Sequence, residues 1–263
     1  MAAKYTLLQI DWPLSSVALV TLNRPEAANA LSGALAGELE LCFTELADEP
    51  KLRAIILTGK GDKAFCAGAD LKERKGMSEA QWHEQHDRFE NATAALRAMH
   101  VPVVAAVGGA AVGGGLELAL ACDFIIASNH ARFALTETSL GIMPGLGGTQ
   151  YLPRAVGLRR AKELIFSASS FSADEALQWG LVNHVVHPAD LMKKAVEIAG
   201  KIANNAPLAV RHAKLAVEEG CTLPIDAALA LELSYYKRLL NSEDRYEGVN
   251  AFNEKRAPEF KGK

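Results

Sequence analysis

The chain has 263 residues, 49% of them hydrophobic and 22% charged, which is long enough for one large domain, or a domain with a small appendage, around a sizeable buried core. Its 28 Lys and Arg against 31 Asp and Glu give a net charge of -3, so bulk charge provides no reason to expect a nucleic-acid or anionic-membrane partner. The four cysteines are far apart and form no CxxC pair, which favours reduced, mostly buried thiols over a zinc site or a disulfide framework.

The first residues predict a hairpin and no targeting signal. Residues 1–11 reach Asp11 before any apolar run as long as a secretory signal, and they are too poor in Arg for a transit peptide, so we expect a cytoplasmic protein. Alternating residues over 5–11 and 17–22 predict two strands. Pro13 and the polar residues around it are expected to form the turn between them.

Helices and strands then alternate to about residue 140. Apolar residues at helical spacing or in short β-branched runs predict helices over 35–46, over 78–99 with Ser78 as the cap, and from Gly114, and strands over 53–58, 103–107, 124–127 and 132–135. This alternation predicts a layered α/β core. The weakly polar run 101–122 contains Pro102 and five glycines, so we expect a turn within a core and not a membrane-spanning helix.

The last third is predicted to be mostly helical. The expected helices cover 158–166, 173–179, 191–203, 207–219 and 223–240, with a short strand at 182–186. No internal repeat or low-complexity linker separates this part from the α/β core. We therefore expect a helical appendage that follows the α/β core without a sharp domain boundary.

Several common site motifs are missing. The sequence has no GxxxxGK[ST] phosphate loop and no GxSxG elbow, and the segment starting at Gly113 lacks the last glycine of GxGxxG. His83 and His86 are one residue short of the HExxH spacing of zinc enzymes, so we interpret them as part of a solvated helix face.

Two glycine-bearing segments, 64–73 and 108–117, combine small residues with the apolar residues that lead into them. Small side chains let a ligand come close to backbone N–H groups, and a glycine run that opens a helix directs free N–H groups at that ligand. These are the requirements of an oxyanion hole. The alternative is that the glycines only permit tight packing.

Two glutamates follow these signals. Glu117 lies two residues beyond the glycine run in an apolar segment, where an unpaired charge costs several kcal/mol unless its pKa moves, and a raised carboxyl pKa suits acid–base catalysis. A buried ion pair with, for example, Arg132 or Arg154 is the alternative. Glu137 lies just past a predicted strand, where catalytic groups are often presented, although such a position is also typical of an ordinary polar loop residue.

Five segments occur in the order typical of one family. They are Leu22-Asn-Arg-Pro25, residues 64–72, Gly113-Gly-Gly-Leu-Glu117, Glu137 and residues 144–150, and residues 251–261 extend the likeness to the C-terminus. Together they resemble the crotonase, or enoyl-CoA hydratase/isomerase, superfamily nearly from end to end. Each segment alone is weak, but five in the right order are specific.

The resemblance implies an α/β fold, a spiral of ββα turns with a perpendicular pair of sheets over residues 1–195, followed by a helical trimerisation region over residues 196–263. We therefore expect a homotrimer or a hexamer. It also implies an acyl-CoA thioester as substrate, with the thioester oxygen held by the backbone N–H groups of Ala69 and Gly114. Residue patterns alone indicate Gly114 but not Ala69.

The resemblance further implies that coenzyme A runs along the first glycine segment, with Ala67, Asp70, Leu71 and Lys72 as matching positions and Ala27 nearby. Lys72 and Lys261 are candidates for its phosphates, the latter from a neighbouring subunit; the alternative is that both are solvated surface lysines. No metal or redox cofactor is expected, because coenzyme A is part of the substrate.

In hydratases of this family two glutamates hold a water over the double bond, and they match Glu117 and Glu137. The resemblance implies that Glu117 helps deprotonate the water that attacks Cβ and that Glu137 supplies the proton to Cα. The expected reaction is hydration of a short-chain or branched enoyl-CoA, in fatty-acid or branched-chain amino-acid breakdown. We expect the walls of the acyl pocket to come from residues 82–96 and 140–146.

Three alternatives stay open. Isomerases of the family generally rely on one carboxylate, so the pair favours hydration, with isomerisation as a side activity. Residues 152–167 and the C-terminus resemble methylglutaconyl-CoA hydratases in particular, which makes that branched substrate an alternative. These relatives include an RNA-binding member, so an RNA-binding module is a hypothesis of another class, but Lys72, Arg74 and Lys75, interrupted by Glu73, form a poor phosphate-tracking stripe.

Overall fold

Two sheets form the centre of the molecule in the computed structural model, which describes residues 4–263. The larger sheet has the strand order β1 (Leu8–Leu14), β2 (Val17–Leu22), β3 (Ala54–Gly59), β5 (Val103–Val107), β7 (Phe124–Ser128) and β10 (His184–Val186). The smaller sheet has the order β4 (Ala64–Cys66), β6 (Ala110–Val112), β8 (Arg132–Ala134) and β9 (Phe171–Ser172). All neighbouring strands are parallel except β1 with β2 and β8 with β9.

The chain builds both sheets at once, as a spiral. Each of three successive strand pairs, β3 with β4, β5 with β6 and β7 with β8, gives its first strand to the larger sheet and its second to the smaller one. Helices α2 (Leu71–Arg74) and α3 (Glu79–Arg97) follow the first pair, α4 (Gly114–Leu120) the second, and the 3-10 turn η2 (Glu137–Leu140) the third. The predicted α/β class and the spiral of ββα turns are confirmed.

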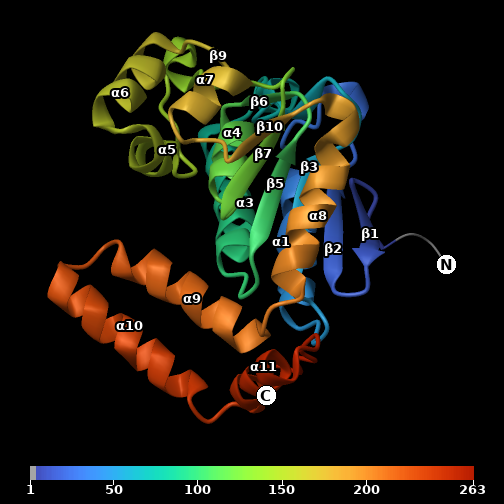
Figure 1. Cartoon of the computed structure of the whole chain (residues 1–263). Coiled ribbons are helices and arrows are strands. Elements are labelled where there is room, and N and C mark those ends of the chain that lie inside the picture. Colours follow the sequence, from blue (N-terminus) through green and yellow to red (C-terminus); the bar gives the residue numbers. More distant parts are fainter. Residues whose placement is uncertain (1–3) are drawn as a thin grey trace.

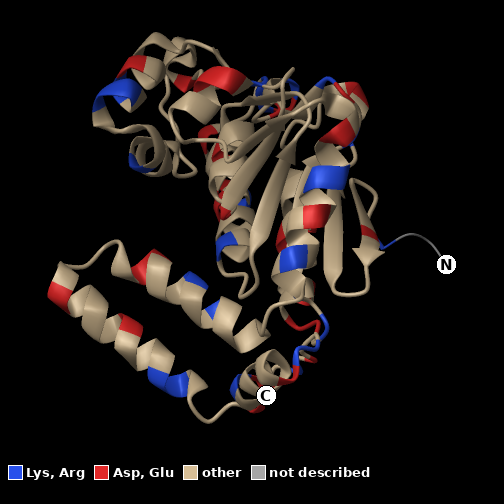
Figure 2. Cartoon of the chain, viewed as in Figure 1, with Lys and Arg blue, Asp and Glu red and all other residues tan. Residues whose placement is uncertain are grey.

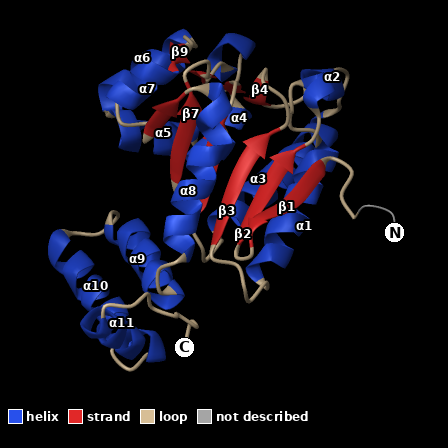
Figure 3. Ribbon diagram, turned by 45° about the vertical axis from the view of Figure 1, so that its right-hand side comes forward, coloured by secondary structure: helices blue, strands red, loops and turns tan. Residues whose placement is uncertain are grey.

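Helices cover both faces of the larger sheet (Figures 1 and 3). The helices α1 (Gly33–Ala47) and α3 pack on one face and α8 (Leu191–Ala203) on the other. Because side chains alternate along a strand, Ile55 and Leu57 of β3 face the first layer while Ala54 and Ile56 face the second. A sheet buried on both faces explains why its central strands are continuous apolar runs.

The predicted boundaries need one correction at the N-terminus. The first strand was expected over 5–11, but β1 covers Leu8–Leu14 and includes Pro13. The strand pairing shifts register between Asp11 and Leu14, and β1 lies at the edge of its sheet. An edge strand with a bulge tolerates the missing N–H of proline, so the turn is reduced to residues 15 and 16.

The other helices lie beyond the smaller sheet and below the core (Figure 1). Those beyond the sheet are α5 (Gly148–Val156), α6 (Leu158–Ser167) and α7 (Ala173–Gln178), and those below are α9 (Pro207–Gly220), α10 (Ile225–Leu239) and α11 (Glu243–Glu254). The predicted boundary between residues 195 and 196 falls inside α8, which is packed on the sheet. The helices that extend from the core therefore begin with α9.

Three properties of the described residues bear on function. No helix within residues 4–263 is both long and apolar enough to cross a membrane. In the same range, no three His, Cys, Asp or Glu side chains are grouped so that they could hold a metal ion. The four cysteines are free thiols, and Cys42, Cys66 and Cys122 are buried.

Candidate active site

The two glycine segments singled out in the sequence meet in space. Gly68 has a φ of +85°, and a Cβ there would lie 2.7 Å from the carbonyl oxygen of Val112 and 3.3 Å from the backbone nitrogen of Gly114. The first segment is held to the chain at Leu31, whose N–H donates to the oxygen of Gly68 and whose oxygen accepts from Asp70, both at 2.8 Å. Glycine at position 68 therefore permits both the left-handed turn and the close approach of the two loops.

The backbone N–H groups of Ala69 and Gly114 lie beside this contact. Both residues line the same cavity. Within the part of the chain that the structure describes, neither N–H donates a hydrogen bond to another protein atom. The two glycine segments are in contact, and each therefore offers one unused N–H hydrogen-bond donor to the cavity.

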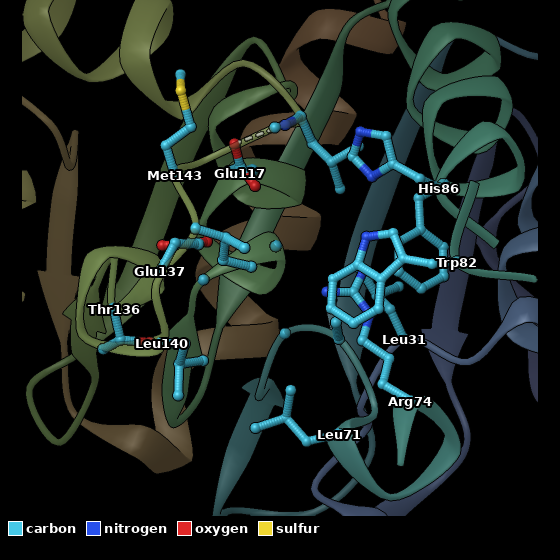
Figure 4. A pocket seen from close by; sticks show the side chains of 18 of the residues that line it. Leu31, Leu71, Arg74, Trp82, His86, Glu117, Thr136, Glu137, Leu140 and Met143 are labelled. Carbon is cyan, nitrogen blue, oxygen red and sulfur yellow. Dashed lines mark hydrogen bonds between the residues drawn. The ribbon is translucent and has the colours of Figure 1, made fainter. Parts of the chain in front are cut away.

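The cavity has a volume of about 460 Å³. Its walls come from the two glycine segments, from the side of α3 and from the loop after η2, as Figure 4 shows. Both segments expected to form the acyl pocket, 82–96 and 140–146, contribute to the lining of this cavity, with Trp82, His83, His86, Phe89, Leu140, Ile142, Met143, Gly145 and Leu146.

Glu117 is fixed inside the cavity by backbone groups. Its side chain is on α4, only 2% of the residue is exposed, and its Oε1 accepts the N–H groups of Leu146 and Gly148, both at 2.8 Å. Burial raises the pKa of Glu117 to about 7; the hydrogen bonds from Gly148 and Leu146 oppose this rise, and the nearby charge of Glu137 adds to it.

The ion-pair alternative for Glu117 is wrong. The Arg132 guanidinium bonds to the carbonyl oxygen of Ala131, and the Arg154 guanidinium bonds to residue Gln150. Neither arginine is paired with Glu117, whose bonded neighbours are the two N–H groups. Burial without a cation leaves the carboxyl with the raised pKa expected of an acid–base catalyst.

Glu137 lies near Glu117 on a second element, on the same side of the cavity (Figure 4). It begins η2 just after β8, and burial raises its pKa. Its Oε2 is buried and has no hydrogen-bond partner among the described residues. Its Oε1 would lie 3.0 Å from a Cβ at Gly113, so this carboxyl faces the start of α4. An unpaired oxygen in such a place is suited to hold a water molecule or a reacting group.

The residues expected to bind coenzyme A are only partly brought together. Ala67 and Leu71 line the cavity with the two glutamates, while Ala27, Asp70 and Lys72 do not. The Asp70 side chain instead caps α2 and pairs with Arg24 at 3.0 Å. Lys261 borders a different cavity of about 210 Å³, near Arg53, His100 and Arg211.

One histidine differs from its prediction. Both residues line the cavity; His83 is exposed as expected, whereas the ring of His86 is partly buried and would lie 2.8 Å from a Cβ at Gly145. The solvated-face interpretation is therefore wrong for His86, because the loop after η2 approaches that side of α3. The recurrence of Trp82, His86 and Phe89 along one helix face is the sequence signal that could have indicated this.

Comparisons with known proteins agree with this geometry. A family model described as enoyl-CoA hydratase/isomerase matches residues 14–263. A short-chain-enoyl-CoA hydratase from Clostridium acetobutylicum is 46% identical over 91% of this chain and 92% of its own length. A crotonyl-CoA hydratase from Syntrophomonas wolfei is 42% identical over 93% and 94%. The crystal structure of an enoyl-CoA hydratase from Bacillus anthracis superimposes with a TM-score of 0.97 at 46% identity, covering 98% of this chain and 100% of that one.

Proposed function

The chain belongs to the enoyl-CoA hydratase/isomerase family and is an enoyl-CoA hydratase, and we propose that Glu117 and Glu137 carry the addition of water across the 2,3 double bond of its substrate. One observation supports this assignment above all others. Two buried carboxyl groups with raised pKa values share a cavity with two unused backbone N–H groups. Acid–base catalysis needs the first pair, and stabilisation of an enolate needs the second.

The N–H groups of Ala69 and Gly114 are proposed to hold the thioester oxygen. As water adds to Cβ, negative charge develops on that oxygen in the enolate, and fixed donors then bind it more tightly than in the ground state. The loss of one such donor typically costs about 3 to 4 kcal/mol of barrier. Coenzyme A is proposed to follow Ala67 and Leu71 out of the cavity.

The environments of the two carboxyl groups support different roles for them. Glu117 accepts two N–H bonds on one oxygen, which favours the carboxylate form and suits a base that takes a proton from water. Glu137 has a buried oxygen without such donors, which favours the protonated form and suits an acid that protonates Cα. The water adds HO to Cβ, and the two carboxyl groups exchange protonation states. These steps use no metal or redox cofactor.

The proposal is tested by following the loss of conjugated thioester absorbance with crotonyl-CoA and with 3-methylglutaconyl-CoA side by side. The wild type is expected to hydrate at least one of them, and Glu117→Gln and Glu137→Gln are each expected to abolish most of that activity. If neither thioester is hydrated while both variants retain some other activity, the assignment is wrong. Product analysis separates hydration from isomerisation.

The hypothesis of an RNA-binding module has less support than the enzyme. It rests on three nearby basic residues, and the guanidinium of Arg74 stacks on Trp82 in the wall of the cavity. Only Lys72 and Lys75 of that group are exposed. A salt-dependent gel shift with no hydratase activity would reverse the order of the two hypotheses.

We propose that the helices α9 to α11 assemble the chain into a homotrimer or hexamer. Apolar side chains on these helices are exposed, among them Val217, Ile225, Leu229, Val249 and Phe252, the last at 83%. In α9 no residue is buried, and in α10 only Tyr235 is, within the described chain. In Figure 2, charged bands on α9 and α10 alternate with uncharged stretches. Exposed apolar side chains grouped on such helices are typical of surfaces that pack against a partner.

A further inference from the structure

Arg74 is a cation in the wall of the acyl cavity. Its guanidinium carbon lies 4.1 Å from the centre of the Trp82 ring and 5.6 Å from that of Phe89, and all three residues line the cavity. In Figure 4, Arg74, Trp82 and His86 lie on one side of the pocket, and Glu117 and Glu137 lie on the other. The cationic group is therefore separated from the two carboxyl groups by the space that an acyl chain would fill.

A chain of hydrogen bonds fixes the position of this guanidinium. The N–H of Gly33 donates to the Glu73 carboxylate at 3.0 Å, and the Gln85 side chain donates to the same carboxylate at 2.7 Å. The Nε of Arg74 then donates to the Gln85 Oε1 at 2.8 Å. Gln85 is 4% exposed, so the group that orients Arg74 is itself held inside the protein.

The other two nitrogens of Arg74 have no protein partner. Among residues 4–263, no carboxylate lies within ion-pair distance of the guanidinium, and only Nε donates a hydrogen bond. Burial lowers the pKa of the half-buried Arg74, and the nearby charge of Glu73 opposes this without a direct ion pair. A planar guanidinium with two free nitrogens is suited to bind a carboxylate at two points.

We propose that Arg74 binds a carboxylate at the end of the acyl chain remote from the thioester, so that the preferred substrates are enoyl-CoA thioesters of dicarboxylic acids. This inference rests on the proposed hydratase function and narrows its substrate class. His86 lines the same wall beside Trp82, and its Nε2 lies 3.1 Å from the Glu90 carboxylate. Apolar groups on the remaining wall, such as Leu140 and Met143, cover the carbon chain.

The decisive comparison uses two substrates that differ in one group. Glutaconyl-CoA is crotonyl-CoA with a carboxylate on its terminal carbon, and both carry the same coenzyme A phosphates. The wild type is expected to show the higher kcat/KM with glutaconyl-CoA. Arg74→Met is expected to lower kcat/KM for glutaconyl-CoA about 30-fold or more, and for crotonyl-CoA less than about 3-fold. Hex-2-enoyl-CoA, uncharged and of similar length, is expected to behave like crotonyl-CoA.

Two further variants sharpen the test. Lys75→Met removes a neighbouring exposed charge outside the cavity and is expected to leave kcat/KM unchanged for both substrates. Arg74→Lys keeps the charge without the planar fork and is expected to recover only part of the glutaconyl-CoA rate. The melting temperature of each variant shows whether it is folded.

Each other outcome overturns the inference. Equal losses on both substrates in Arg74→Met would mean that Arg74 contacts coenzyme A phosphate or only supports the wall. Unchanged glutaconyl-CoA kinetics would mean that it binds no carboxylate. If the wild type hydrates crotonyl-CoA but not glutaconyl-CoA, the substrate class is wrong and the hydratase function stands. If it hydrates none of these three thioesters and not 3-methylglutaconyl-CoA either, the proposed function itself fails.

Discussion

The Glu117 carboxylate and the backbone of Gly148 are in direct contact. The Glu117 Oε1 accepts the Gly148 N–H at 2.8 Å, and a Cβ at position 148 would lie only 3.0 Å from that same oxygen. The first N–H of α5 thus holds the carboxylate in place, and the absence of a side chain leaves the space for it. Position 148 therefore controls where Glu117 points.

Gly148→Ala is expected to displace the Glu117 carboxylate and to lower kcat with crotonyl-CoA by about 100-fold, since a misplacement of about 1 Å can cost that much. The added methyl would also lie 3.0 Å from atoms of Leu135 and Pro144. Steady-state kinetics measures the effect. Gly37→Ala is the matched control, because a Cβ at this position in α1 meets nothing within 4 Å. Equal activity of the two variants would show that the contact has no catalytic importance.

Glu117→Gln is expected to stabilise the protein while inactivating it. Since burial raises the pKa of Glu117 from 4.5 to about 7, the folded state binds a proton that the unfolded chain has lost, and stability falls as pH rises through this interval. The variant lacks this fall, so above pH 7 its free energy of unfolding should exceed that of the wild type by up to about 3 kcal/mol. Urea unfolding at pH 4 and pH 8 measures this difference in the free energy of unfolding. At pH 4, where Glu117 is protonated in both states, the wild type and the variant should be equally stable.

The pH profile of hydration should show an acid limb near pH 7. The proposed base must be ionised, and the pKa of Glu117 is raised to about 7 by burial. Burial also raises the pKa of Glu137, and the charges of the two carboxyl groups interact, so the acid limb belongs to the pair and not to Glu117 alone. An activity that is flat from pH 5 to pH 9 would contradict the assignment.

A charge on the exposed apolar face of the C-terminal helices should break the assembly. Leu229 of α10 is 54% exposed and Phe252 of α11 is 83% exposed. If a partner subunit covers them, Leu229→Asp and Phe252→Asp should each shift the mass measured by light scattering towards the monomer, because burying a charge without a partner is costly. Glu232→Gln on α10 is the control. A wild type that is already monomeric would disprove the proposed oligomer.

Sequence patterns predicted the frame better than the details of the site. Strands such as Val103–Val107 and the helix capped by Ser78 were predictable because their apolar residues are continuous or regularly spaced. The strands β4 and β6 were not identified, since three residues between glycines are too short to show a period. The helix α11, whose apolar residues are largely exposed, was also missed.

The same limit applies to the functional residues. Glu117 could be recognised because it is a charge within an apolar helix, whereas Glu137 needed the family resemblance. The free N–H of Ala69 depends on how two loops meet, and no local pattern reports that. Arg74 was considered only as part of a basic stripe, because its stacking on Trp82 and its bond to Gln85 depend on how α2 lies against α3.

The spiral of strand pairs separates the two proposed catalytic carboxyl groups from the groups proposed to surround the acyl chain. Glu117 and Glu137 follow directly on strands of the smaller sheet, while Arg74, Met143 and Leu146 belong to segments outside both sheets. Residues 72–77 could therefore be exchanged between related enzymes without touching the groups that hold Glu117, whereas the loop 141–147 could not, because its Leu146 N–H donates to the Glu117 carboxylate. In this architecture, one wall of the cavity can change independently of the carboxyl groups and the other cannot.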